Sequence, residues 1–210
     1  MPVDTTALAL FIVAALTICI TPGPDMLYVL ANGIHQGPKA GVISALGMAT
    51  GMLCHTVAAA LGLAALFSAS PVLYKIVQYA GAAYLFWIGV QTLRDPVFTG
   101  KVKEREHSSL FTIWQRAVIT NLLNPKIILF YVAFLPQFVR STPGLSSATG
   151  QFIFLGLTFV LLGLMVDSTL GILSGTLNTV LVQNARLSRS LNWFSALVFI
   201  GLAVRLVLTQ

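Results

Sequence analysis

Six long apolar segments make up most of this chain, and they constrain its fold more than any other feature. They cover approximately residues 6–34, 40–67, 72–93, 111–138, 151–173 and 191–208. A hydrocarbon core about 30 Å thick requires about 20 apolar residues in a helix. Only 9% of the residues are charged, against about 25% in soluble domains. We therefore predict an all-α integral membrane protein with six transmembrane helices and no separate soluble domain.

Two of these segments are interrupted by proline. The first is broken at Thr21–Pro24 and the fourth at Asn124–Pro125. Proline removes a backbone donor and bends or ends a helix. The freed backbone groups lie near mid-depth, where only protein or a wet cavity can satisfy them. Broken helices at this depth are typical of transporter binding sites.

Four ionisable residues lie within the apolar segments, at Asp25, His55, Lys126 and Asp167. A charge at bilayer depth is costly and usually marks a pathway for ions or polar solutes. Asp25 and Lys126 each directly follow a proline break. Both are about 15 Å of helix from the expected cytoplasmic end. They are thus expected to face each other at the centre of the protein.

The two breaks together predict a binding site with one acid and one base, which could accept an ammonium group and attract a carboxylate. Asp25 is expected to bind the ammonium group. Lys126 is expected to bind the carboxylate, together with half-helix N-terminal amides at the break formed by Gly23 and Pro24. In the alternative interpretations, Asp25 only caps the second half-helix and the Lys126 stem reaches toward an interface.

Further polar residues lie beside the break or inside neighbouring segments. The amides of Asn121 and Asn124 could bind substrate or satisfy freed backbone groups. His55 and Asp167 each lie in a ladder of glycines spaced four apart, which permits close helix packing. We expect Asp25, Asp167 or His55 to carry a coupling proton. The alternative is a buried His55–Asp167 hydrogen bond that joins two helices.

The two halves of the chain show a weak repeat. A shift of 112 residues places Gly51 on Gly163 and His55 on Asp167, whereas a shift of 101 places residues 24–25 on 125–126. Three helices in each half give the halves opposite orientations, so the repeat would be inverted. We therefore expect two inverted three-helix repeats in a single domain over residues 1–210, with helices 1 and 4 broken at proline.

Lysine and arginine outside these helix interiors are distributed unevenly. Eight lie on one side and three on the other, and the positive-inside rule places the eight in the cytoplasm. Both termini are then periplasmic, and residues 95–110 form a cytoplasmic linker between repeat one (about 1–94) and repeat two (about 111–210). The eight are Lys39, Arg94, Lys101, Lys103, Arg105, Arg116, Arg186 and Arg189, and the three are Lys75, Arg140 and Arg205.

A series of motifs runs in order along nearly the whole chain. They are Thr21–Asp25, Gly47 and Gly51 with His55, Gly81–Gly89, Gln115–Ala117, Asn121–Lys126 and Phe134–Phe138. In these motifs the chain resembles the lysine exporter / homoserine-threonine exporter (LysE/RhtB) family of bacterial amino-acid efflux proteins. The resemblance implies a small inner-membrane exporter driven by the proton gradient, with two inverted repeats. It leaves open basic, branched, hydroxylated and sulfur-containing amino acids as substrates.

The sequence therefore predicts a proton-coupled amino-acid exporter without a cofactor, acting on a small molecule in a lipid bilayer as a monomer or homodimer. With no second acid expected beside Asp25, a neutral side chain such as that of homoserine, threonine or leucine fits better than a lysine-like one. The alternative is a cation or metal exporter, which would need several converging carboxylates, thiols or histidines. An enzyme is not expected, because no nucleophile or cofactor motif is present, and nucleic-acid binding is not expected without a basic aromatic face.

Cys19 and Cys54 both lie within apolar segments and lack metal-type spacing. We expect two buried side chains that behave as small hydrophobes.

Overall fold

A computed structural model describes residues 3–63, 71–94, 107–140, 147–183 and 185–208. All regular structure within these ranges is helical, as predicted. The α-helices are α1 (Thr5–Ile20), α2 (Pro24–Gln36), α3 (Pro38–Ala58), α5 (Pro71–Arg94), α6 (Leu110–Leu122), α7 (Pro125–Leu129), α8 (Ala148–Gln183) and α9 (Ala185–Leu208), with the π-helical segments η1 (Ala59–Leu63) and η2 (Phe130–Phe134) and the 3-10 helix η3 (Leu135–Phe138).

The first predicted break lies between α1 and α2. Asp4 caps α1 by accepting a hydrogen bond from the Ala7 amide at 3.2 Å. The helix ends at Thr21, and α2 begins at Pro24, the first-turn position where proline's missing N–H is tolerated. The two helices are bent by 54° relative to each other. The break that the prolines predict is thus confirmed.

The second predicted break lies between α6 and the helical residues that follow Pro125. The bend there is 48°, which confirms the prediction. Beyond α7, however, the chain does not continue as regular α-helix. It forms η2 and then η3, which contains Pro136. Nothing in the local sequence predicted the π-helical segment, because its hydrogen-bond shift depends on tertiary contacts.

Length and hydropathy identify up to four candidate membrane spans in the described part of the chain. Two are single helices, Pro38–Gly62 and Ala148–Thr176, and two are the bent pairs. The third and sixth predicted segments form α5 and α9, of 24 residues each, which are not among these candidates. The chain therefore contains several apolar helices fit for a membrane, while the count of six spans remains a prediction.

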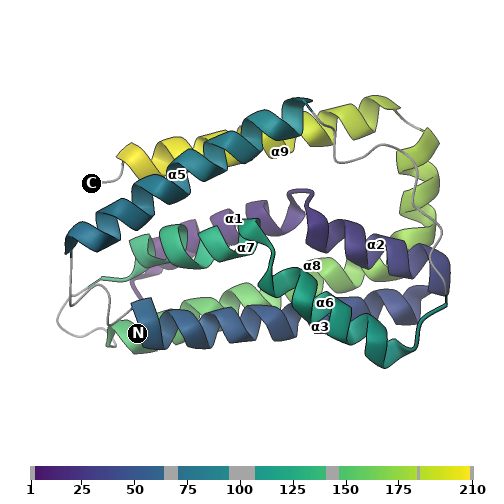
Figure 1. Cartoon of the computed structure of the whole chain (residues 1–210), viewed down its shortest axis with the longest axis horizontal. Coiled ribbons are helices and arrows are strands. Elements are labelled where there is room, and N and C mark those ends of the chain that lie inside the picture. The colour runs from purple at the N-terminus through teal and green to yellow at the C-terminus, as the bar shows by residue number, and fades with distance from the viewer. Residues whose placement is uncertain (1–2, 64–70, 95–106, 141–146, 184, 209–210) are drawn as a thin grey trace.

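The helices are arranged as a bundle with a separate antiparallel pair. Figure 1 shows α5 and α9 side by side along one edge, with α1, α2, α3, α6, α7 and α8 gathered below them. In the bundle, α3 packs closely against α8. At one crossing, a Cβ on Gly41 would lie 2.6 Å from the Cα of Gly171, so only glycine allows the two backbones to approach this closely.

Aromatic rings join the two bent spans outside the breaks. The Phe130 ring of η2 stacks on Phe159 of α8, with 4.2 Å between ring centroids. Phe11 of α1 contacts Phe138 of η3 edge-on, at 5.3 Å. All four rings are buried. These contacts pack α1 against η3 and η2 against α8.

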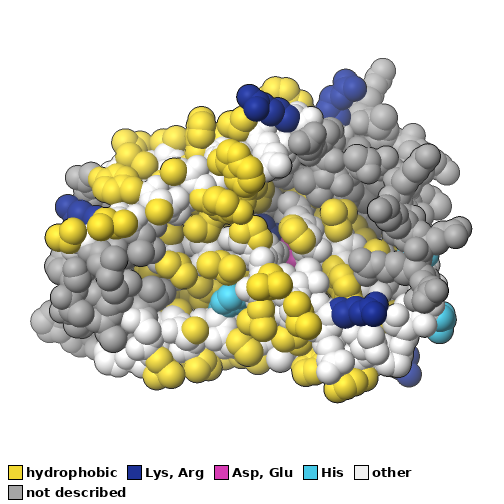
Figure 2. Space-filling view, in the orientation of Figure 1, with side chains coloured by type: hydrophobic (Ala, Val, Ile, Leu, Met, Phe, Trp, Pro, Cys, Tyr) yellow, Lys and Arg dark blue, Asp and Glu magenta, His cyan; other side chains and the backbone are white. Residues whose placement is uncertain are grey.

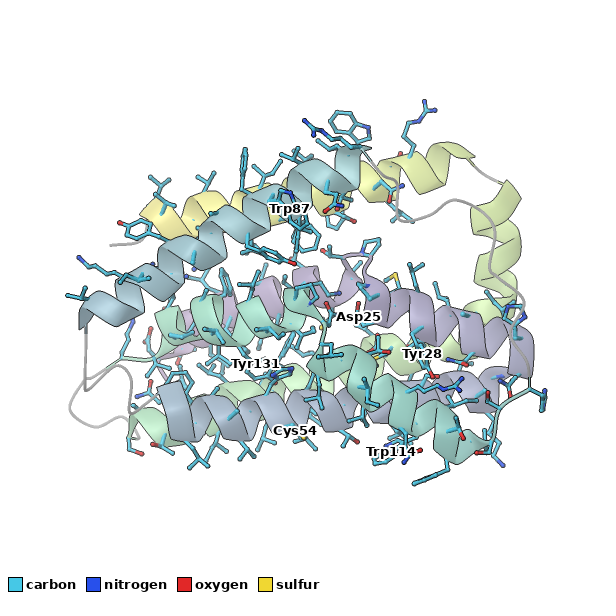
Figure 3. The ribbon with its side chains drawn as sticks, in the orientation of Figure 1. Asp25, Tyr28, Cys54, Trp87, Trp114 and Tyr131 are labelled. Atoms are coloured by element: carbon cyan, nitrogen blue, oxygen red, sulfur yellow. The ribbon has the colours of Figure 1, made fainter. Side chains whose placement is uncertain are left out.

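Some sequence-based expectations need correction. The fifth helix is longer than the predicted 151–173, because α8 runs through 36 residues. Cys54 is exposed rather than buried, whereas Cys19 is buried as expected. Figure 3 shows Cys54 pointing away from the bundle. Most of the predicted linker, residues 95–106, lies outside the described residues.

Candidate functional site

Asp25 and Lys126 meet where the two bent spans cross. The Lys126 ammonium Nζ lies 2.8 Å from Asp25 Oδ2, and the two side chains are 2% and 8% exposed. In Figure 3, Asp25 lies near the middle of the molecule, at the break between α1 and α2. The sequence-based expectation that these two charges face each other is therefore confirmed in geometry.

The Lys126 ammonium is also bonded to the end of α1. It donates to the backbone oxygens of Thr21 at 3.0 Å and Ile18 at 3.3 Å. These carbonyls belong to the last turn of α1, where the helix dipole presents negative partial charge. The ammonium is thus held by one carboxylate and two carbonyls. The interpretation in which the lysine reaches toward an interface is wrong.

Asp25 lies in the first turn of α2 but does not cap it. No side chain caps α2, whose N-cap residue is Gly23. The second carboxylate oxygen, Oδ1, has no hydrogen-bond partner among the described residues. A Cβ at Gly23 would lie 2.8 Å from this oxygen. The break therefore leaves one acceptor of Asp25 unused, beside a position that accommodates no larger residue without a shift.

The two asparagines near the second break behave differently. Asn124 caps α7, since its Oδ1 accepts a hydrogen bond from the Lys126 amide at 3.1 Å, while its Nδ2 has no described partner. Asn121 is 1% exposed, and neither its Nδ2 nor its Oδ1 has a partner among the described residues. Buried amides are usually hydrogen-bonded, so Asn121 offers an unused donor and an unused acceptor.

His55 lies in another part of the same region. Its ring stacks on Tyr131, at 5.5 Å between centroids, and lies beside the backbone of Asn121. Its Nε2 has no described partner. No hydrogen bond joins His55 to Asp167 within the described residues, so the alternative interpretation of an interhelical His55–Asp167 bond is wrong.

Tyr131 is a residue that the sequence-based reasoning missed. Its hydroxyl lies 2.9 Å from both the Met52 backbone oxygen and the Thr56 hydroxyl of α3. The side chain is 1% exposed. These bonds fix η2, which continues the helix of Lys126, against α3. No spacing or motif distinguished Tyr131 from the other aromatic residues.

Asp167 of α8 approaches the ion pair, which the sequence did not predict. Asp167 is buried, with 5% of the residue exposed, and its carboxyl group interacts electrostatically with both Asp25 and Lys126. The Cys19 thiol of α1 interacts with all three groups. A second acid therefore lies near Asp25. The premise from which a neutral substrate was inferred is wrong.

Figure 2 shows the face of the protein that includes this region. The surface is hollowed between the α5 side and the layer that contains α3 and α6, with an acidic side chain visible at its floor and a histidine on its wall. Within the described residues, no group of three or more His, Cys, Asp or Glu side chains could hold a metal ion. The region offers one ion pair, a further carboxyl group and unpaired amides, which suits a small zwitterion.

Similar proteins place the chain in a family. A family profile for LysE type translocators matches residues 16–210. The leucine efflux protein of Enterobacter sp. (strain 638) is 37% identical over 201 residues, which cover 93% of this chain and 92% of that protein. The leucine efflux protein of Klebsiella pneumoniae is 36% identical over 206 residues, or 95% and 94% of the two chains. No solved structure gives a significant match.

These relatives are named as efflux proteins, which makes this chain a transporter and not an enzyme. Its apolar helices agree with a multi-pass membrane protein. The family match covers nearly the whole chain. This chain belongs to the LysE family of translocators.

Proposed function

We propose that this protein exports neutral amino acids from the cytoplasm by alternating access, in exchange for protons. The observation that carries the proposal is the buried Asp25–Lys126 ion pair, 2.8 Å long, at the crossing of two broken spans. A zwitterion can replace both partners. Its ammonium takes the place of Lys126 at Asp25, and its carboxylate takes the place of Asp25 at Lys126.

The remaining groups of the site complete this binding mode. The Oδ1 of Asp25, which has no described partner, can accept a hydrogen bond from the ammonium group beside Gly23 and Pro24. Asn121 and the Nδ2 of Asn124 supply hydrogen bonds near Lys126. Asp25, Asp167 and His55 are the groups that could carry the coupling proton. A neutral side chain is supported by the relatives, which are named leucine efflux proteins.

We infer six spans in two inverted repeats, an architecture that many alternating-access transporters share, with repeat one over about 1–94 and repeat two over about 111–210 of one domain. The packing of α3 on α8 supports this arrangement. Gly41 faces Gly171, and Thr56, fifteen residues further along α3, faces Gly156, fifteen residues earlier in α8. Equivalent helices of inverted repeats are expected to pack antiparallel in this way. Figure 1 shows α5 and α9 antiparallel as well.

The bacterial inner membrane is the expected location, with both termini periplasmic and the linker cytoplasmic. Eight of the eleven lysine and arginine residues other than Lys126 then lie on the cytoplasmic side. In this orientation the site opens alternately to the two sides. The amino acid enters it from the cytoplasm, and the proton enters it from the periplasm.

Counterflow of radiolabelled leucine into proteoliposomes tests the proposal. Vesicles preloaded with unlabelled leucine should accumulate label through the purified wild-type protein. Asp25→Asn and Lys126→Ala should each lower the initial rate at least about tenfold, because each removes a charged hydrogen-bonding partner worth about 1.5–3 kcal/mol. Normal counterflow in both variants would contradict the proposed site.

The chain offers a matched control in its second described ion pair. Arg140 and Asp4 lie 3.7 Å apart, and their side chains are 58% and 39% exposed. Exposed pairs contribute little, about 0–1 kcal/mol. Arg140→Ala and Asp4→Asn should therefore transport leucine at nearly the wild-type rate. If leucine counterflow occurs but does not respond to an imposed proton gradient, leucine stands as a substrate and proton coupling is refuted.

A further inference from the structure

The buried charge at the crossing does not balance. Asp25 and Asp167 are both buried acids, and within the described ranges Lys126 is the one cation that interacts with them. The ammonium of Lys126 is bonded to Asp25. Among the described residues, Asp167 has neither an ion pair nor a hydrogen bond. A buried carboxylate without a partner is strongly unfavourable, so such a group takes up a proton instead.

Asp167 is held inward by its position on α8. Gly163 and Gly171 lie one helical turn before and after it, on the same face. A Cβ at Gly163 would lie 2.7 Å from the Met52 side chain, and one at Gly171 would lie 2.7 Å from the Gly41 backbone. Both turns are therefore packed tightly against α3, and Asp167 between them is a buried residue.

The ionisable groups that face Asp167 come from three helices. They are the Cys19 thiol of α1, Asp25 of α2 and Lys126 of α7. The residues of α3 at these contacts, Gly41 and Met52, carry no charge. His55 is not one of the facing groups, because its interactions are with Tyr131 and the Asn121 backbone. The cluster thus lacks one positive charge.

Resting on the function proposed above, we infer that Asp167 alone carries the coupling proton and that the substrate ammonium displaces it. In the empty state, Asp167 is protonated and Asp25 is ionised against Lys126. The arriving ammonium lies between the two carboxyl groups, the O–H bond of Asp167 breaks, and its proton passes to water. The substrate carboxylate moves to Lys126. Proton and amino acid therefore exclude each other, which makes their exchange obligatory.

The pH dependence of leucine affinity tests this inference. In wild-type proteoliposomes, the KM for leucine counterflow should rise about tenfold per pH unit on the acidic side, the slope for one competing proton. In Asp167→Asn, the amide cannot ionise. Counterflow should persist with a KM independent of pH, while accumulation driven by a proton gradient is lost. Asp4→Asn, an acid-to-amide change at an exposed position, should keep both wild-type properties.

The outcomes separate the inference from the proposed function. A wild-type protein without gradient-driven leucine transport refutes the proposed proton coupling itself. If Asp167→Asn retains gradient-driven transport, only the role of Asp167 is refuted. The same conclusion follows if Asp167→Asn loses counterflow although it unfolds at the wild-type temperature. A requirement for sodium in place of protons would also overturn the inference.

Labelling the wild-type protein with a hydrophobic carbodiimide supplies a second test that does not depend on the folding of any variant. Carbodiimides react with protonated carboxyl groups in apolar surroundings. Peptide mass spectrometry should find the adduct on Asp167 and not on Asp25, and leucine should protect against it. An adduct on Asp25, or labelling of Asp167 that leucine does not reduce, would contradict the inference.

Discussion

At the scale of single residues, the central ion pair is placed within two helix ends that favour its charges. Asp25 lies in the first turn of α2, where the helix dipole stabilises an anion, and the Lys126 ammonium contacts the last carbonyls of α1. The sequence predicted this meeting because prolines fixed both breaks and one charge followed each break. The positions of the prolines and of the charges that follow them can be read from the local sequence, without knowing how distant helices pack.

The position of Asp167 could not be predicted in the same way. Whether a side chain in the fifth segment reaches the centre depends on the rotation and register of α8. Close contacts determine both, such as Gly171 with Gly41 and Ser174 with Gly33. The glycine ladder indicated tight packing, but no feature of the sequence showed which helix it would meet. The same limit applies to Tyr131 and its bonds to α3.

Replacement of Asn121 by alanine should impair substrate binding without destabilising the protein. Its amide makes no described hydrogen bond, so its loss leaves no protein group unpaired. A lost substrate hydrogen bond of about 0.5–1.5 kcal/mol corresponds to a KM for leucine roughly two- to tenfold higher. Leucine counterflow and thermal unfolding in detergent measure the two effects.

The neighbouring Thr120 supplies the control for Asn121. Its one hydroxyl hydrogen bond among the described residues goes to the Arg116 backbone oxygen at 2.8 Å, on an exposed part of α6. Thr120→Ala should leave the KM unchanged. A lower unfolding temperature with an unchanged KM in Asn121→Ala would indicate a purely structural role for the asparagine.

At the scale of helices, the glycine ladder of α8 consists of positions with very different surroundings. A Cβ at Gly171 would meet the backbone of Gly41, whereas a Cβ at Gly175, one turn later, meets nothing within 4 Å. Gly171→Ala must separate α3 from α8 and should lower the unfolding temperature by several degrees. Gly175→Ala should unfold at the wild-type temperature or slightly above it, since alanine favours a helix by about 1 kcal/mol over glycine.

Thermal unfolding of the two purified variants in the same detergent checks this prediction. Equal unfolding temperatures would mean that the α3–α8 crossing contributes little to stability. Gly171→Ala should also slow leucine counterflow, because the crossing holds Asp167 in place. The sequence predicted small residues here for packing, and the structure distinguishes which of them the packing requires.

At the scale of the whole molecule, the all-helical fold, the positions of both breaks and the family were predicted correctly from the sequence. Apolar segment length and proline placement are local properties, which explains this success. The irregular η2–η3 segment and the full length of α8 were not predicted, because tertiary contacts determine where such helices shift or end. The six spans and the inverted repeat remain predictions.

The orientation in the membrane is a prediction for the whole chain. If the eight lysine and arginine residues of the larger group lie in the cytoplasm, both termini are expected to be periplasmic. Alkaline phosphatase fused after Gln210 should be active, because it folds only outside the cytoplasm, while a fluorescent protein fused there should be dark. A fusion within residues 95–106 should give the opposite pattern. Active phosphatase at both positions would exclude an odd number of spans between them.

The closed contact between Asp25 and Lys126 has a consequence for a cell in which no cargo is present. Because the two charges neutralise each other, neither stabilises a continuous chain of water molecules across the membrane. An idle copy is therefore expected to conduct almost no current. Many copies in the membrane, available when the amino acid accumulates, are therefore expected not to dissipate the membrane potential on which the energy supply of the cell depends.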